Sequence, residues 1–137
     1  MDEGEMGSIL YVEDEPIVRM EMSEALRVAG FRVVEAGTGK AAMECIRTEG
    51  ASISGLVTDI NLGAGADGWA VARAGREQNP NLPVIYVTAQ SYDDWAARGV
   101  PNSALIAKPF VPAQLVVALS AALNAASATS KQVDGPD

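Results

Sequence analysis

The sequence predicts a single α/β domain built on a parallel sheet, and three observations lead to this expectation. The chain has 137 residues, of which 48% are hydrophobic, and this size and composition suit one domain with one core. Short apolar runs recur along the chain and alternate with segments of helical periodicity. Strands and helices that alternate in this way are joined by right-handed crossovers, which give a parallel sheet with helices on both faces.

The apolar runs predict five strands. Each run contains few polar residues, which is typical of parallel strands whose two faces are both buried. A half-exposed strand would instead alternate apolar and polar residues. The predicted strands cover residues 9–12, 32–36, 56–58, 84–87 and 105–107.

The first two helices are predicted from their apolar faces and their ends. One is expected over residues 16–29, where Gly30 supplies the stop. The second follows Thr38, whose side chain can cap it, and ends at Gly50. Cys45 falls on the apolar face of this second helix and is interpreted as a packing residue.

The other three helices are predicted from residues that begin or end helices. One is expected over residues 69–78, a short one over residues 91–99, and the last one from residue 112 to about residue 126. Side-chain oxygens cap helix starts, proline suits a first turn, and the residue before a proline avoids the helical region. The residues that mark these ends are Asp67 and Pro80, Ser91 with Asp94 and Gly99, and Pro112.

Three acidic residues follow apolar runs, where strands would deliver them to one edge of the sheet. Glu13 and Asp14 come after the first run and Asp59 after the third. Carboxylates gathered there repel one another, by about 4 kcal/mol per pair at about 4 Å in a protein-like medium, so a divalent cation would resolve the repulsion. An oxygen-only cluster suits Mg²⁺. The alternative is that Glu13, Asp14 and Glu15 only place negative charge at a helix N-terminus.

Two further polar residues, Thr88 and Lys108, follow the fourth and fifth runs and should reach the same edge. In an open sheet of this type, ligands bind beyond the carboxyl ends of the strands. Taken alone, a threonine or a lysine in such a position is usually a turn former or a solvated loop residue. Together with the three acids, they favour one functional site.

The composition excludes several classes of protein. The 10 Lys and Arg against 18 Asp and Glu give a net charge of -8, which disfavours contact with nucleic acid or anionic lipid. Histidine is absent, and with it the commonest general base and metal ligand. A single cysteine allows no internal disulfide, and no secretion signal or membrane span is evident. We therefore expect a cytoplasmic protein that binds neither nucleic acid nor membrane.

Four short motifs, taken in order, resemble the receiver domain of two-component response regulators. They are Val-Glu-Asp-Glu, Thr-Asp-Ile-Asn, Val-Thr-Ala and Lys-Pro-Phe, and the similarity spans residues 9–123. The resemblance implies a flavodoxin-like (βα)5 doubly wound parallel sheet with strand order 2-1-3-4-5. We expect residues 1–7 to be an N-terminal extension, residues 8–125 the receiver domain and residues 126–137 a flexible tail.

The resemblance also implies a role for each site residue. Asp59 would accept a phosphoryl group from a phosphohistidine on a histidine kinase or phosphotransfer protein. Mg²⁺ would be held by Glu13, Asp14 and Asp59 and by the backbone carbonyl of Asn61. Thr88 and Lys108 would contact phosphoryl oxygens. The protein would thus be a signalling protein, not an enzyme, which acts on an unknown downstream partner or serves as a phosphate sink.

The chain departs from the family pattern in three places. Gly63 stands where the family usually has proline, and the loop before Asp67 is one residue longer than usual. The interval from Thr88 to Lys108 is about two residues shorter, which shortens the fourth helix. Leu105 replaces the aromatic residue that reports phosphorylation in many receivers. We therefore expect the response to lie in the loop after Thr88 and in the shortened helix.

The kinase is expected to dock on the first helix, with Ile17, Arg19 and Met20 outside the core face, by analogy with the family. With no second domain evident in the sequence, the chain is expected to act as a stand-alone receiver. One alternative is a phosphatase of the haloacid dehalogenase type, which also uses Mg²⁺, Thr and Lys but carries Asp-x-Asp after its first strand. Another is a receiver-fold interaction module that is never phosphorylated.

Overall fold

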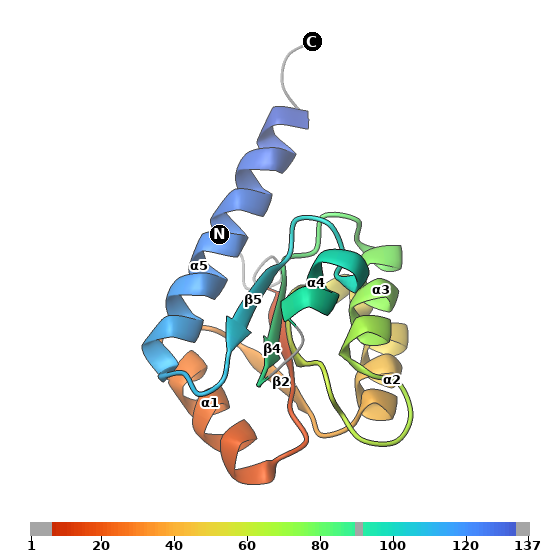
Figure 1. The fold of residues 1–137 in the computed structure, drawn as a ribbon. Helices are drawn as coiled ribbons and strands as arrows, with labels where there is room; N and C mark the ends of the chain where they lie inside the picture. The colour runs from red at the N-terminus through yellow and green to blue at the C-terminus, as the bar shows by residue number, and fades with distance from the viewer. Residues whose placement is uncertain (1–6, 90–91, 134–137) are drawn as a thin grey trace.

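Five parallel strands form one sheet in the order β2-β1-β3-β4-β5 (Figure 1). The fold comes from a computed structural model that describes residues 7–89 and 92–133. Because the chain crosses from one sheet edge back to the centre and then proceeds outward, helices cover both faces. The order and the doubly wound topology confirm the predicted fold. The strands are β1 (Ser8–Val12), β2 (Val33–Ala36), β3 (Ile53–Asp59), β4 (Val84–Thr88) and β5 (Ala104–Ala107).

The helices form two layers around this sheet. In Figure 1, α1 and α5 lie on one side of the strands, and α2 and α3 lie on the other with α4 beside α3. A 3-10 turn, η2 (Gly50–Ser52), precedes β3. None of the helices in the described part of the chain combines the length and apolarity needed to cross a membrane. The helices are α1 (Pro16–Val28), α2 (Gly39–Glu49), α3 (Gly68–Gln78), α4 (Tyr92–Arg98) and α5 (Pro112–Val133).

Each face of the sheet carries its own hydrophobic core. Along β1, Ile9 and Tyr11 pack in the core beneath α1 and α5, whereas Leu10 and Val12 pack in the core beneath α2 and α3. All four side chains are at most 1% exposed. Successive residues of a strand point to opposite faces, so a strand covered on both sides must be apolar at every position. This explains why β1 appears in the sequence as an uninterrupted apolar run from Ile9 to Val12.

Two of the predicted helix caps are present. The Thr38 Oγ1 accepts a hydrogen bond from the backbone N–H of Ala41 at 3.0 Å. Asp67 Oδ1 accepts one from the backbone N–H of Ala70 at 3.0 Å. Each bond satisfies a backbone donor at the helix start that has no partner within the helix. The third predicted cap, Ser91, lies outside the described residues.

Two elements are longer than predicted. The last helix, α5, does not end near residue 126 but continues to Val133, and its C-terminal part projects beyond the sheet (Figure 1). Residues 121–128 contain five alanines, which have the highest helix propensity, and the helix continues from them through the residues that follow. Strand β3 begins at Ile53, three residues earlier than predicted. Ser54 and Gly55 interrupt the apolar run, but Ile53 pairs with Ser8 and Gly55 pairs with Ile9 on β1, with a register shift between these two pairs. Residues 1–6 and 134–137 of the expected extension and tail are not among those described.

Candidate functional site

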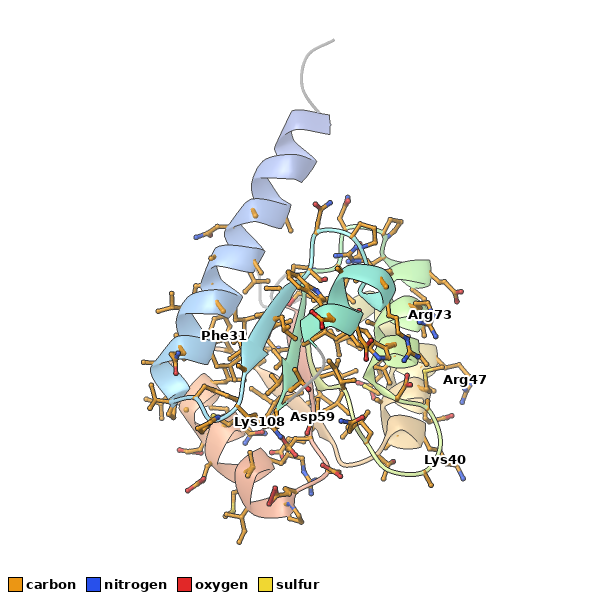
Figure 2. All side chains as sticks on the ribbon, viewed as in Figure 1. Phe31, Lys40, Arg47, Asp59, Arg73 and Lys108 are labelled. Atoms are coloured by element: carbon orange, nitrogen blue, oxygen red, sulfur yellow. The ribbon has the colours of Figure 1, made fainter. Side chains whose placement is uncertain are left out.

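The site lies where the carboxyl ends of β1, β3 and β5 meet. Glu13 follows β1 directly, Asp59 is the last residue of β3 and Lys108 follows β5 directly. Figure 2 shows Asp59 and Lys108 beside one another at this end of the sheet. Parallel strands end at the same edge of a sheet, so this topology brings together residues that lie up to 95 positions apart in the sequence.

Three carboxylates gather within this site. One oxygen of each of Glu13, Asp14 and Asp59 lies within 4.8 Å of the others. Glu13 and Asp59 are buried, whereas Asp14 is exposed at the rim. Such an all-oxygen donor set, open to water on one side, fits Mg²⁺, which takes few carboxylates and keeps several of its waters. The structure therefore brings the predicted acidic residues together in an arrangement that suits this ion.

Lys108 lies between two of these acids. Its Nζ donates to Asp59 Oδ2 at 2.9 Å and to Glu13 Oε1 at 3.2 Å. Burial by itself lowers the pKa of Lys108, but the hydrogen bond to Asp59 and the charges of Asp59 and Glu13 outweigh it and raise the pKa above its usual value. The side chain is therefore a fixed positive charge beside the Asp59 carboxylate.

Both carboxylate oxygens of Glu13 have hydrogen-bond partners. In addition to the Lys108 contact, its Oε2 accepts a hydrogen bond from the backbone N–H of Glu15 at 3.0 Å. Burial raises the pKa of Glu13 to about 7, the Glu15 bond opposes this shift, and the charge of Asp59 adds to it. With a pKa of about 7, Glu13 exchanges a proton near neutral pH.

Thr88 and Asn61 occupy different environments. Thr88 ends β4, is 1% exposed, and its backbone carbonyl accepts a hydrogen bond from the backbone N–H of Lys108 at 2.8 Å. That bond fixes the end of β5 against the end of β4. Asn61 is exposed and lies two residues after Asp59, in the loop that leads to α3. The predicted use of its carbonyl as a metal ligand stays a prediction.

The backbone conformation of the loop after Asp59 explains why position 63 holds glycine and not the proline usual in the family. Gly63 has a φ of +79° and Gly65 a φ of +90°, in the left-handed region. Proline has a fixed φ near -65°, so it cannot occupy position 63 in this conformation. The loop returns to the strand at Gly68, where a methyl group would collide with the carbonyl oxygen of Asp59. The longer loop is thus closed by direct packing against Asp59.

Arg19 does not lie on the exposed surface of α1 where the sequence placed it. On α1, Ile17 and Met20 are 67% and 63% exposed, as expected for a docking surface. Arg19 instead turns inward, where its Nη1 donates to the carbonyl oxygen of Glu13 at 2.8 Å and its Nε pairs with Glu35 Oε1 at 3.4 Å. Glu35 lies on the neighbouring strand, so only the sheet pairing could reveal this contact.

Helix α4, in the region expected to carry the response, contacts the end of the loop that follows Asp59. Arg98 of α4 lies 5.4 Å from the centre of the Trp69 ring and 3.7 Å from Asp67 Oδ2. Trp69 is buried and packs against Tyr86 of β4, with ring centres 4.8 Å apart. Leu105 packs at the edge of the same core. The Lys108-Pro109 peptide bond is cis.

The comparisons with known proteins agree with this geometry. The response regulator receiver domain family matches residues 9–120 of the chain. A response regulator receiver protein from Sinorhizobium medicae WSM419 has 41% sequence identity and a TM-score of 0.85, covering 89% of this chain and 98% of that one. A receiver domain from the hybrid histidine kinase CckA has 26% identity and a TM-score of 0.72, covering 85% of this chain and 99% of that one.

Longer proteins are also similar over this region. The probable transcriptional regulatory protein TcrX of Mycobacterium tuberculosis is 30% identical over 130 residues, which are 93% of this chain and 54% of TcrX. The sensor kinase CckA of Brucella abortus is 32% identical over 120 residues, which are 85% of this chain and 12% of CckA. The chain thus spans about half of one relative and a small part of the other. It belongs to the receiver domain family of response regulators.

Proposed function

We propose that this chain is a phosphoacceptor in a phosphorelay, with Asp59 as the residue that takes the phosphoryl group. The observation that carries the proposal is the 2.9 Å contact between the Lys108 ammonium and the Asp59 carboxylate, in a site with two further acids. A buried carboxylate beside a fixed cation is suited to attack phosphorus, because the cation offsets the charge of the incoming phosphoryl oxygens.

The transfer moves one phosphoryl group between two side chains. An oxygen of Asp59 attacks phosphorus and forms a P–O bond while the N–P bond of a phosphohistidine breaks, and the electron pair of that bond returns to the imidazole nitrogen. Lys108 pairs with one phosphoryl oxygen, and the hydroxyl of Thr88 donates a hydrogen bond to another. The product is an acyl phosphate on Asp59.

The acidic residues would hold the metal ion that this transfer requires. The carboxylates of Glu13, Asp14 and Asp59 and the backbone carbonyl of Asn61 are the proposed ligands, and their oxygen chemistry suits Mg²⁺. When bound, Mg²⁺ supplies positive charge opposite the phosphoryl oxygens. The Lys108 ammonium forms ion pairs with both Asp59 and Glu13, so Mg²⁺ would compete with it for these two carboxylates.

The proposed donor is a histidine kinase or a histidine phosphotransfer protein in the cytoplasm. Receiver domains interact with histidine kinases, and one relative of this chain is itself a sensor kinase. The exposed apolar side chains Ile17 and Met20 on α1 offer the docking surface. After phosphorylation the chain would act through a downstream protein or drain phosphate from the kinase. It would catalyse only its own phosphorylation and dephosphorylation.

The proposed response lies in the loop after Thr88 and in α4. Leu105 has no aromatic ring to swing inward, so another contact must report the phosphoryl group. The contact of Arg98 with Asp67 and Trp69 connects α4 to the loop that follows Asp59. Amide exchange in α4, compared with and without beryllium fluoride as a phosphate mimic, tests this assignment. Unchanged protection would contradict it.

Intact mass spectrometry after treatment with acetyl phosphate and Mg²⁺ tests the phosphoacceptor role. The protein should gain one phosphoryl group, and Asp59→Asn and Asp14→Ala should stay unmodified. A wild-type chain that stays unmodified with every donor would be an interaction module. Repeated turnover of small phosphate esters would instead indicate a phosphatase.

A further inference from the structure

We propose that Arg19 is a positioning residue for the metal site and that it acts by fixing the peptide between Glu13 and Asp14. The inference rests on the proposed Mg²⁺ site and adds a residue to it. Arg19 contacts no predicted ligand side chain. Its Nη1 donates to the carbonyl oxygen of Glu13 at 2.8 Å, from the first turns of α1.

The other groups of Glu13 already have partners. Its backbone N–H donates to the carbonyl of Ala36 on β2 at 3.1 Å, and its two carboxylate oxygens accept from Glu15 and Lys108. The carbonyl oxygen is the group that Arg19 holds. A carbonyl and the following amide lie in one rigid plane, so this bond also fixes the orientation in which the chain enters Asp14.

Asp14 depends on this constraint more than the other acids do. Glu13 and Asp59 are buried and bonded to Lys108, whereas Asp14 is exposed. Within the described residues, no hydrogen bond or ion pair holds the Asp14 carboxylate. Its position relative to the other two carboxylates is therefore set by its backbone, and Arg19 restrains that backbone.

Glu35 pairs with the guanidinium of Arg19, and the absence of a side chain at Gly37 leaves space for it. Glu35 Oε1 lies 3.4 Å from Arg19 Nε, and Glu35 Oε2 lies 3.1 Å from Arg27 Nη2. On the other side, Gly37 leaves room for the guanidinium. A Cβ at Gly37 would lie 2.8 Å from Arg19 Nη1, and the three nearest atoms to that Cβ all belong to Arg19. Arg27 shares Glu35 with Arg19 but does not contact Glu13, so it offers a matched control.

Positioning and simple electrostatics predict opposite effects on Mg²⁺ binding. Removal of a positive charge near an acidic cluster should tighten the binding of a cation. Loss of a group that orients a ligand should weaken it, typically by about tenfold or more. The sign of the change in Mg²⁺ affinity therefore distinguishes a positioning residue from a residue that only adds charge.

The experiment is calorimetric titration with Mg²⁺ of the full wild-type chain and of three variants, Arg19→Gln, Arg27→Gln and Gly37→Ala. Arg19→Gln should raise the Kd by about tenfold, while Arg27→Gln, which removes the same charge, should change it by less than about twofold. Gly37→Ala keeps the charge but displaces the guanidinium, so it should also weaken Mg²⁺ binding. The metal-free thermal midpoint should fall more for Arg19→Gln than for Arg27→Gln, because both variants lose a bond to Glu35 and only Arg19→Gln also loses the bond to the Glu13 carbonyl.

An unchanged or lower Kd in Arg19→Gln would overturn the inference, and so would equal losses in Arg19→Gln and Arg27→Gln. If Arg19→Gln does not fold, the inference is tested by Gly37→Ala. A Kd for Mg²⁺ in Gly37→Ala equal to that of the wild-type chain would overturn the inference. A wild-type chain that binds no Mg²⁺ would instead refute the proposed metal site itself. The two failures are thus distinguishable.

Discussion

Mg²⁺ binding should depend on pH through Glu13. Burial raises the pKa of Glu13 from 4.5 to about 7, so the metal must displace a proton from this acid near neutral pH. A carboxyl with this pKa is roughly one tenth ionised at about pH 6 and roughly nine tenths ionised at about pH 8. If the ionised form binds Mg²⁺, the affinity should rise about tenfold over this interval.

Calorimetry measures this effect in two ways. The Kd for Mg²⁺ should fall about tenfold from about pH 6 to about pH 8, and at about pH 7 binding should release about half a proton per ion, seen by comparing buffers of different ionisation enthalpy. Glu13→Gln should bind more weakly and lose both the pH dependence and the proton release. A Kd that does not vary with pH in the wild-type chain, or the same variation in Glu13→Gln, would refute the reasoning.

The same pKa has a consequence for the metal-free protein. Because the folded state holds the Glu13 proton more tightly than the unfolded state, this group stabilises the fold below about pH 4.5 and loses that contribution as the pH rises through about 7.

Three substitutions and one control variant give further tests. Lys108→Met should abolish phosphorylation by acetyl phosphate, seen by intact mass, but strengthen Mg²⁺ binding in calorimetry, because the carboxylates lose a competing ammonium. Asp67→Ala removes the cap of α3 and should lower the free energy of unfolding in urea by about 1 kcal/mol. Leu119→Ala should lower it by about 3 kcal/mol because Leu119 is fully buried, whereas Val117→Ala, at a position 67% exposed, should lower it by less than about 1 kcal/mol.

Most of the fold could be predicted because burial on both faces leaves a strong pattern in the sequence. Every residue of β1 from Ile9 to Val12 is buried, and so an uninterrupted apolar run marks the strand. The apolar pattern did not predict the start of β3, where close packing and not hydrophobicity determines the residue. Position 55 of β3 suits glycine because a Cβ there would approach Ile9 Cδ1 to 2.9 Å, a constraint that no residue near it in the sequence reveals.

The site was predictable to the extent that it depends on strand ends. Asp59 and Lys108 follow from their positions after apolar runs, and the sheet brings them to 2.9 Å. The contacts that tune these residues depend on tertiary pairing and could not be predicted. Arg19 bonds to the Glu13 carbonyl while it pairs with Glu35 on the neighbouring strand, and neither contact is evident in the sequence pattern. Its place on α1 made it resemble a surface residue.

The measurement that tests the central claim most directly is chemical mapping of the phosphorylated residue. After treatment with acetyl phosphate and Mg²⁺, borohydride reduces an aspartyl phosphate to homoserine, which peptide mass spectrometry locates. We predict homoserine at position 59 and at no other acid, and none when Mg²⁺ is omitted. Homoserine at position 14, or a phosphorylated chain with an unmodified Asp59, would contradict the account.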